Sequence, residues 1–166
     1  MRLFHARPLA VRLGPMDEHP AAQHESLGLA LRHAHLRAAR LFAEELRPLD
    51  LENHHAGILL HIGVLGLQTQ RQLVDSMGVD KSAMVRTLDI LEARGLVRRE
   101  AHPTDRRAHA VVLTDAGRAC VERVAAAAAR ADERMTACFT AEERGLFHSM
   151  VARFTCAPDD EQGEAP

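Results

Sequence analysis

Apolar residues recur every three or four positions along most of this chain, which is the spacing of one face of an α-helix. Between residues 26 and 47 they predict a long helix, which Pro48 ends. A second helix is expected over residues 54–65, with Asn53 as its N-cap and Gly66 after its last residue. This second helix is apolar on most sides, so we expect it to be largely buried.

The same spacing continues in two shorter helices that a glycine-containing turn separates. Thr69 is a candidate N-cap for a helix that reaches Ser76, and Gly78 supplies the positive φ that a tight turn needs. Asp80 then caps the next helix, and Gly95 lies where a C-terminal glycine is typical. Two helices joined in this way are typical of a helix-turn-helix.

Two β-prone runs, residues 96–100 and 109–113, follow the helix-turn-helix, and a polar loop joins them. They predict a hairpin whose tip carries Asp105, Arg106 and Arg107. A guanidinium group on a hairpin tip suits a narrow, negatively charged groove, and the neighbouring carboxylate can orient it through a charge-assisted hydrogen bond. The helix-turn-helix and this hairpin together predict a winged helix whose partner is double-stranded DNA.

Further amphipathic helices follow the winged helix. Thr114 is a candidate N-cap for a helix that runs through the alanines of residues 125–129 to about Cys138. Thr140 and Glu143 have the spacing of a capping box, which opens a last helix. The apolar stripes of these helices exceed what a small winged helix can cover, so we expect them to form a dimer interface.

The expected fold is mainly α with a small β-hairpin wing, in one domain with helical extensions. The core is expected to be aliphatic, because the chain has no Trp or Tyr and only five Phe. Met16 is an alternative start to Met1. The expected parts are a disordered arm (1–25), a domain of residues 26–156 with its winged helix at about 53–113 and dimerisation helices at about 26–47 and 114–155, and a disordered acidic tail (157–166).

The formal net charge of −2 does not by itself indicate nucleic acid. Between residues 71 and 107, however, basic residues outnumber acidic ones, and the acidic C-terminal tail offsets them. Three cysteines without close pairing favour a reducing, cytoplasmic location. No apolar run approaches the ~18 residues of a membrane span. We find no nucleophile–base pattern, phosphate-binding glycine loop or paired carboxylates, so we expect no enzyme activity and no cofactor.

Several segments, in this order and spacing, resemble the MarR family of bacterial transcription regulators. The resemblance covers roughly residues 26–155, and it implies a homodimer that carries two winged helices. It also implies binding to a palindromic operator and release by a small molecule or an oxidant. The segments that carry it are residues 70–74 (QRQLV), 78–82 (GVDKS), 91–97 (LEARGLV), 105–107 (DRR) and 113–117 (LTDAG).

The expected DNA contacts lie on the exposed N-terminal face of the second helix of the helix-turn-helix and on the hairpin. A helix that enters the major groove brings such side chains to base edges and phosphates. The alternative is an ordinary solvated helix face and a surface ion pair, in a winged helix used for protein contacts alone. The expected DNA-binding residues are Lys81, Ser82, Ala83, Arg86 and Thr87 on the helix, and Arg98, Asp105, Arg106 and Arg107 on the hairpin, with Arg99 beside Arg98 as a further phosphate contact.

Eleven histidines suggest a regulatory site. The resemblance implies a ligand pocket where the first two helices meet the start of the helix after Thr114. Guanidinium and imidazole groups there would suit a small organic anion or a phenol. The alternative is that the histidines only pack helices together. The candidate ligand-binding residues are His33, Arg37, His54, His55 and Arg118.

A zinc-responsive regulator of the same fold is a further alternative. The pairs His33/His35 and His54/His55 lack the i, i+4 spacing of metal ligands on one helical face. The resemblance implies that zinc-responsive members carry further metal ligands at the positions that correspond to residues 115–118 of this chain, and this chain has no histidine there. Hydroperoxide-sensing members carry a reactive cysteine in the first helix, where this chain has none. Because the histidine pairs lack the spacing of metal ligands, and because residues 115–118 contain no histidine, we expect no metal site.

Overall fold

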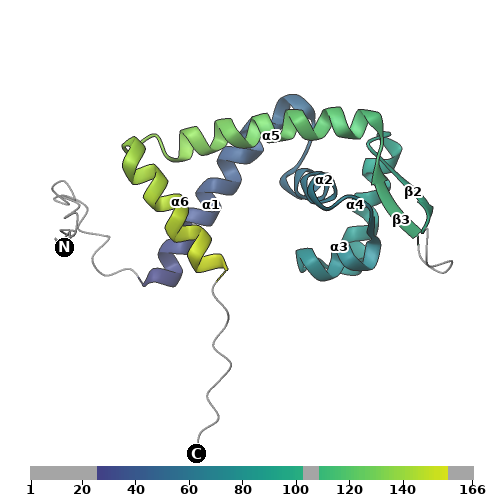
Figure 1. Ribbon diagram of the computed structural model, residues 1–166, viewed down its shortest axis with the longest axis horizontal. Coiled ribbons are helices and arrows are strands. Elements are labelled where there is room, and N and C mark those ends of the chain that lie inside the picture. Colours follow the sequence, from purple (N-terminus) through teal and green to yellow (C-terminus); the bar gives the residue numbers. More distant parts are fainter. Residues whose placement is uncertain (1–25, 103–108, 157–166) are drawn as a thin grey trace, which may run out of the picture. The chain divides into compact units, whose positions relative to one another are not determined.

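A computed structural model describes residues 26–102 and 109–156 (Figure 1). It is mostly helical, with a small antiparallel sheet, as the sequence predicts. The elements, in chain order, are α1 (Leu27–Leu46), the short 3-10 helix η1 (Arg47–Leu49), α2 (Asn53–Leu65), β1 (Gln68–Thr69), α3 (Gln70–Met77), α4 (Lys81–Ala93), β2 (Val97–Ala101), β3 (His109–Leu113), α5 (Asp115–Met135) and α6 (Ala141–Thr155).

The chain divides into two compact units, residues 1–34 and 35–166. The described part of the first unit is residues 26–34, where the hydroxyl of Ser26 accepts a hydrogen bond from the backbone N–H of Leu29 at 3.3 Å. The second unit contains the rest of α1, from His35 onward, and every later element. No helix in the described part of the chain has the length and apolar character needed to cross a membrane.

Helices α2, α3 and α4 and the sheet form the winged helix, which Figure 1 shows from blue (α2) through teal to green (β3). The strand order is β1-β3-β2, and all neighbours are antiparallel. Val97 pairs with Leu113 and Ala101 with His109, so β2 and β3 form the expected hairpin. The strand β1 was not anticipated, because its two residues are polar and too few to show an alternating pattern.

An aliphatic core joins α2, α4, the sheet and α5. On α4 the side chains of Met84, Leu88 and Leu91 are fully buried, at the i, i+4, i+7 spacing of one helical face. This face fixes which side of α4 is left for solvent or a partner. The core cluster is completed by Leu59, Ile62, Leu73, Val97, Val111 and Val124, among others.

The predicted N-caps of four helices are confirmed. Thr69, Asp80, Thr114 and Thr140 each accept a hydrogen bond from a backbone N–H in the first turn of α3, α4, α5 and α6. The expected cap of α2 was wrong.

Helix α2 is capped by Glu52 rather than by Asn53. His55 Nδ1 accepts a hydrogen bond from the backbone N–H of Glu52 at 3.1 Å. The side chain of Asn53 points elsewhere, because its Nδ2 donates to the carbonyl of Ala39 at 2.8 Å. Asn53 therefore links α2 to α1.

The start of α5 lies directly against the start of β2. Thr114 donates from its backbone N–H to the carbonyl of Leu96 at 3.1 Å and from its hydroxyl to that of Gly95 at 2.6 Å. A Cβ atom placed on Gly117 would lie only 1.9 Å from the same Leu96 oxygen. Glycine at position 117 therefore allows α5 to approach the wing this closely.

Ion pairs join the far end of α5 to α1. Arg130 Nε donates to Glu45 Oε2 at 2.8 Å, while Arg134 donates to Glu44 Oε2 at 2.7 Å and to Glu45 Oε1 at 2.8 Å. The hydrogen bonds from these arginines hold the pKa of both carboxyl groups below the ordinary value. Helix α5 is thus connected to the wing at one end and to α1 at the other.

Candidate nucleic-acid interface and ligand cavity

The N-terminal end of α4 presents polar and basic side chains on a fixed scaffold. Asp80 Oδ2 accepts hydrogen bonds from the backbone N–H groups of Ser82 at 2.9 Å and Ala83 at 3.0 Å, and also from the Ser82 hydroxyl. The bond from the Ser82 hydroxyl, followed by that from the Ala83 backbone, lowers the pKa of Asp80. Lys81, Ser82 and Arg86 are exposed and Ala83 is half-buried. This end of α4 is therefore available to a polar partner.

Thr87 does not belong to this exposed face, and the expectation that it would was wrong. Its residue is only 6% exposed, and its hydroxyl donates to the Ala83 carbonyl at 2.9 Å. Position 87 lies three residues after Met84 and four before Leu91, which places it on the buried side of the helix. A base edge cannot reach this hydroxyl unless α4 leaves the core.

Two arginines on β2 have different surroundings. Arg98 is exposed, and its Nε donates to Glu100 Oε2 at 3.1 Å. Arg99 is bound to α4: its guanidinium donates to Asp89 Oδ1 at 2.6 Å and to Glu92 Oε2, and its backbone N–H donates to Glu92 Oε1 at 2.9 Å. Burial alone would lower the pKa of Arg99, but these bonds raise it overall. Arg99 therefore fixes the wing to α4, which the sequence did not reveal, and Arg98 remains available to phosphates.

Three further candidates, Asp105, Arg106 and Arg107, lie outside the described residues. The described hairpin ends at the pair Ala101 and His109.

Two of the candidate ligand-binding residues, Arg37 and Arg118, do not line a common recess. Arg37 donates to the carbonyl of Met135 at 3.0 Å, which ties α1 to α5. Arg118 donates to the Leu113 carbonyl at 3.1 Å and to the carboxylate of Asp115. Arg118 lines a recess beside the wing together with Arg98, whereas Arg37 does not.

Two of the histidine candidates, His54 and His55, lie together at the start of α2. The rings of His54 and His55 lie 4.1 Å apart between centroids. His55 is 5% exposed, and burial, followed by the charge of His54, lowers its pKa. His55 lines a recess with Arg47 and Arg94, away from Arg118. His33 belongs to the first unit, so it is not placed relative to the other candidates. The imidazoles of His54 and His55 therefore pack against each other at the start of α2 instead of facing a common cavity.

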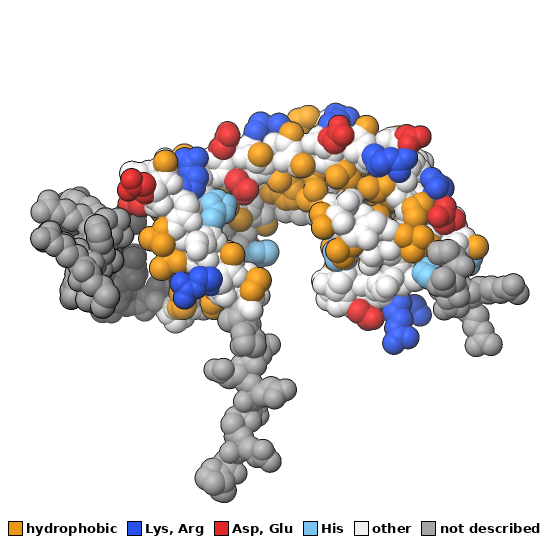
Figure 2. All heavy atoms as spheres, in the orientation of Figure 1, with side chains coloured by type: hydrophobic (Ala, Val, Ile, Leu, Met, Phe, Trp, Pro, Cys, Tyr) orange, Lys and Arg blue, Asp and Glu red, His pale blue; other side chains and the backbone are white. Residues whose placement is uncertain are grey.

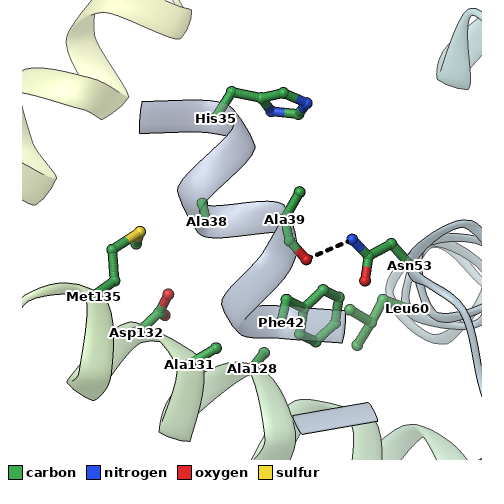
Figure 3. A pocket seen from close by; sticks show the side chains of 10 residues that line it. All are labelled: His35, Ala38, Ala39, Phe42, Asn53, Leu60, Ala128, Ala131, Asp132 and Met135. Atoms are coloured by element: carbon green, nitrogen blue, oxygen red, sulfur yellow. Dashed lines mark hydrogen bonds between the residues drawn. The ribbon is translucent and has the colours of Figure 1, made fainter. Parts of the chain in front are cut away.

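A cavity of about 380 Å³ lies instead between α1, α2 and the C-terminal half of α5 (Figure 3). Its polar lining groups come from His35, Asn53 and Asp132. The sequence does not reveal this cavity, because much of its wall is alanine, which by itself indicates only strong helix formation. The apolar lining residues are Ala38, Ala39, Phe42, Leu60, Ala128, Ala131 and Met135.

Residues 26–102 and 109–156 contain no group of three or more His, Cys, Asp or Glu side chains that could hold a metal ion. The Cys120 thiol is buried, and the thiols of Cys138 and Cys156 are exposed and unbridged.

A helix-turn-helix followed by a short-stranded wing, with basic side chains at the exposed start of its second helix, defines a winged-helix protein suited to double-stranded DNA. Comparisons with known proteins agree. A family model described as MarR family matches residues 49–108. A Thauera aromatica protein, provisionally named a transcriptional regulatory protein for the hcr operon, is 31% identical over 131 residues, covering 76% of this chain and 77% of the relative.

Solved structures show the same likeness. Wild-type MarR from E. coli in its apo form has a TM-score of 0.73 and 27% identity, over 78% of this chain and 97% of that one. A mutant of the same protein, crystallised with operator DNA, has a TM-score of 0.69 and 26% identity, over 82% and 99% of the two chains. This chain belongs to the MarR family, and it is a DNA-binding transcription regulator.

Proposed function

We propose that the protein is a homodimeric repressor that binds a palindromic operator in the cytoplasm and leaves it when a small organic molecule binds, without catalysing a reaction. The observation that carries this proposal is the start of α4, where Asp80 fixes the backbone and leaves basic and hydroxyl side chains exposed. This is the part of a winged helix that enters the major groove.

Within this proposal, the residues at the start of α4 read base edges and flanking phosphates. Ser82 can donate or accept a hydrogen bond, the Ala83 methyl suits a thymine methyl, and Arg86 suits a guanine or a phosphate. Lys81 and Arg98 neutralise phosphates. The wing-tip residues Asp105, Arg106 and Arg107 are proposed from the sequence alone, with Arg106 in the minor groove.

The dimer is supported by an apolar surface on α6. None of the residues of α6 is buried within the chain, although the helix has a complete capping box. Figure 2 shows hydrophobic side chains on the surface over α6. A second copy would cover such a surface, and a two-fold dimer would place its two α4 helices on half-sites about 10 base pairs apart. The exposed large apolar residues of α6 are Leu146, Phe147, Met150, Val151 and Phe154.

The ligand response is supported by the position of the cavity. One of its walls is α2, which packs in the core of the winged helix, and another is α5, which begins against the wing. A molecule that binds better to one spacing of these helices shifts the separation of the two reading heads. Coupling of about 1–3 kcal/mol, the usual range, would weaken operator binding between several-fold and a hundredfold.

A direct test is titration of the protein into a labelled duplex taken from upstream of its own gene, with anisotropy read at two salt concentrations. We expect two protomers per duplex. The slope of log affinity against log salt should be about −0.9 for each phosphate contact. Arg106→Ala should weaken binding strongly while sedimentation shows an intact dimer. Binding no tighter than to a scrambled duplex, for this and other candidate operators, would contradict the proposal.

A further inference from the structure

We propose that Arg99 is a positioning residue through which the wing and α4 bind DNA as one unit. Its guanidinium joins β2 to Asp89 and Glu92 of α4, and these three residues are called the strap below. The strap itself touches no DNA in this proposal; it holds the wing at a fixed angle to α4. The inference rests on the proposed contact of the wing-tip residue Arg106 with the minor groove.

The first observation is that the guanidinium of the strap spans two carboxylates of α4. Arg99 Nη2 donates to Asp89 Oδ1 at 2.6 Å, and its Nη1 donates to Glu92 Oε2. Positions 89 and 92 are three residues apart, so these carboxylates are neighbours on one face of the helix. A planar guanidinium bound at two points is fixed in direction as well as in distance, which a single ion pair does not achieve.

The second observation is a backbone contact at the edge of the sheet. Within the described sheet, the strand order β1-β3-β2 makes β2 an edge strand, whose outer N–H groups face no further strand. Glu92 Oε1 accepts a hydrogen bond from the backbone N–H of Arg99 at 2.9 Å, so α4 takes the place of a further strand at this position. Both the side chain and the backbone of Arg99 are therefore held by α4.

The third observation is the position of the strap along β2. Two residues before Arg99 is Val97, which is only 2% exposed and belongs to the core. Two residues after it is Ala101, in the last described pair of the hairpin. The core therefore holds β2 at its start, and the strap holds it a second time, nearer the wing tip. Two points of attachment prevent the hairpin from turning about one of them.

Two DNA contacts on one rigid body strengthen each other. Once α4 has bound, a fixed wing meets the neighbouring groove at a high effective concentration, whereas a loose wing must first be ordered at a cost in entropy. Without the strap, removal of Arg106 should therefore cost little. Arg98 provides the contrast on the same strand, because its side chain is 56% exposed, against 25% for Arg99, and pairs with Glu100 of β2 itself.

A double-mutant cycle measures this coupling. The duplex is one that the wild-type protein selects from a random-sequence pool, and affinities are read by anisotropy. Arg106→Ala should weaken binding by about tenfold or more in the wild type, but by no more than about threefold in Arg99→Gln, which is a coupling of ordinary size. Arg98→Gln is the control: it removes a proposed phosphate contact, and Arg106→Ala should still cost about tenfold in its presence, because the two contacts are then independent.

Hydrogen exchange of the full-length protein tests the strap without DNA. In Arg99→Gln, the amides of β2 and β3 should exchange about tenfold faster because the wing opens locally, while those of α2 remain protected. Arg98→Gln should leave these exchange rates unchanged. Asp89→Asn removes one carboxylate of the strap from an exposed position, so the core stays intact. It should change the exchange of the wing and the coupling to Arg106 in the same direction, by a smaller amount.

The outcomes distinguish this inference from the proposed function. The same effect of Arg106→Ala in both backgrounds, or unchanged wing exchange in Arg99→Gln, would overturn the inference while operator binding stands. Faster exchange of α2 as well would show that Arg99 only stabilises the fold, and would also overturn it. No effect of Arg106→Ala on the wild type would overturn the proposed wing contact and this inference together. Failure to select any duplex concerns the proposed function alone, because exchange decides whether the strap holds the wing.

Discussion

Substitution of Gly117 by alanine tests the close contact between α5 and the wing. The new Cβ would lie 1.9 Å from the Leu96 carbonyl oxygen, whereas a carbon and a carbonyl oxygen in contact are about 3.3 Å apart. The backbones must therefore separate by about 1.4 Å by the same measure. The same oxygen accepts the hydrogen bond from the Thr114 N–H at 3.1 Å, so this bond is disturbed as well.

The expected loss of stability follows from three contributions. Overpacking costs about 1–3 kcal/mol, and a weakened hydrogen bond costs about 0.5–1.5 kcal/mol. The higher helix propensity of alanine returns about 1 kcal/mol. We expect Gly117→Ala to lower the free energy of unfolding by about 0.5–3.5 kcal/mol, the sum of these contributions, and to weaken operator binding because the wing is displaced.

Gly145→Ala is the matched control, because Gly145 lies within α6 and an added Cβ meets no atom within 4 Å. This change should raise stability by about 0.5–1 kcal/mol. Both variants are unfolded in urea at one fixed protomer concentration, since dimer stability depends on concentration. If Gly117→Ala were as stable as Gly145→Ala, the packing of α5 on Leu96 described above would be incorrect.

Three further predictions concern single side chains. Thr87→Val should leave operator affinity within about twofold of wild type, well short of the tenfold change that 1.4 kcal/mol would cause, because the Thr87 hydroxyl bonds to its own helix. A tenfold loss of affinity, measured by anisotropy, would show that Thr87 contacts a base. Burial lowers the pKa of His55 below 6.5 in the folded protein, so the unfolded chain takes up the proton first, and the free energy of unfolding should fall as the pH drops from about 6.5. His55→Gln, unfolded in urea at pH 7.5 and 5.5, should show a smaller loss of stability between the two pH values. An unchanged loss would exclude His55 as its source. Glu45→Gln should lower the melting temperature, most clearly at low salt, because it weakens the ion pairs with Arg130 and Arg134. An unchanged melting temperature at low salt would show that these ion pairs do not hold α1 to α5.

The sequence predicted the elements that local chemistry determines. Thr69, Asp80, Thr114 and Thr140 could be recognised as caps because each acts on the turn that follows it. The hairpin was recognisable from two β-prone runs around a polar loop. The fold class followed, since helical spacing and turn glycines do not depend on distant contacts.

The features that escaped prediction depend on tertiary contacts. Asn53 has the composition of an N-cap, but its amide binds Ala39 on another helix, and Glu52 takes the capping position. Thr87 is polar, yet its place between Met84 and Leu91 buries it. No local signal shows where one helix approaches another.

The cavity between α1, α2 and α5 illustrates the same limit. Arginine and histidine residues were predicted to bind the ligand, but Arg37 and Arg118 donate hydrogen bonds to backbone carbonyls. The cavity is lined instead mostly by alanine and other apolar residues, which come together only once three helices are placed. A run of alanines near a polar residue of a neighbouring helix is the signal that could have found it.

If the start of α4 reads DNA, the operator affinity of Arg86→Ala is the most direct test. Arg123→Ala, which removes the same charge from an exposed position on α5, is the control. We predict that Arg86→Ala weakens binding at least tenfold, about 1.4 kcal/mol, and that Arg123→Ala stays within about twofold of wild type by the same scale. Equal affinities for both variants, with the dimer intact, would show that the start of α4 does not read the operator.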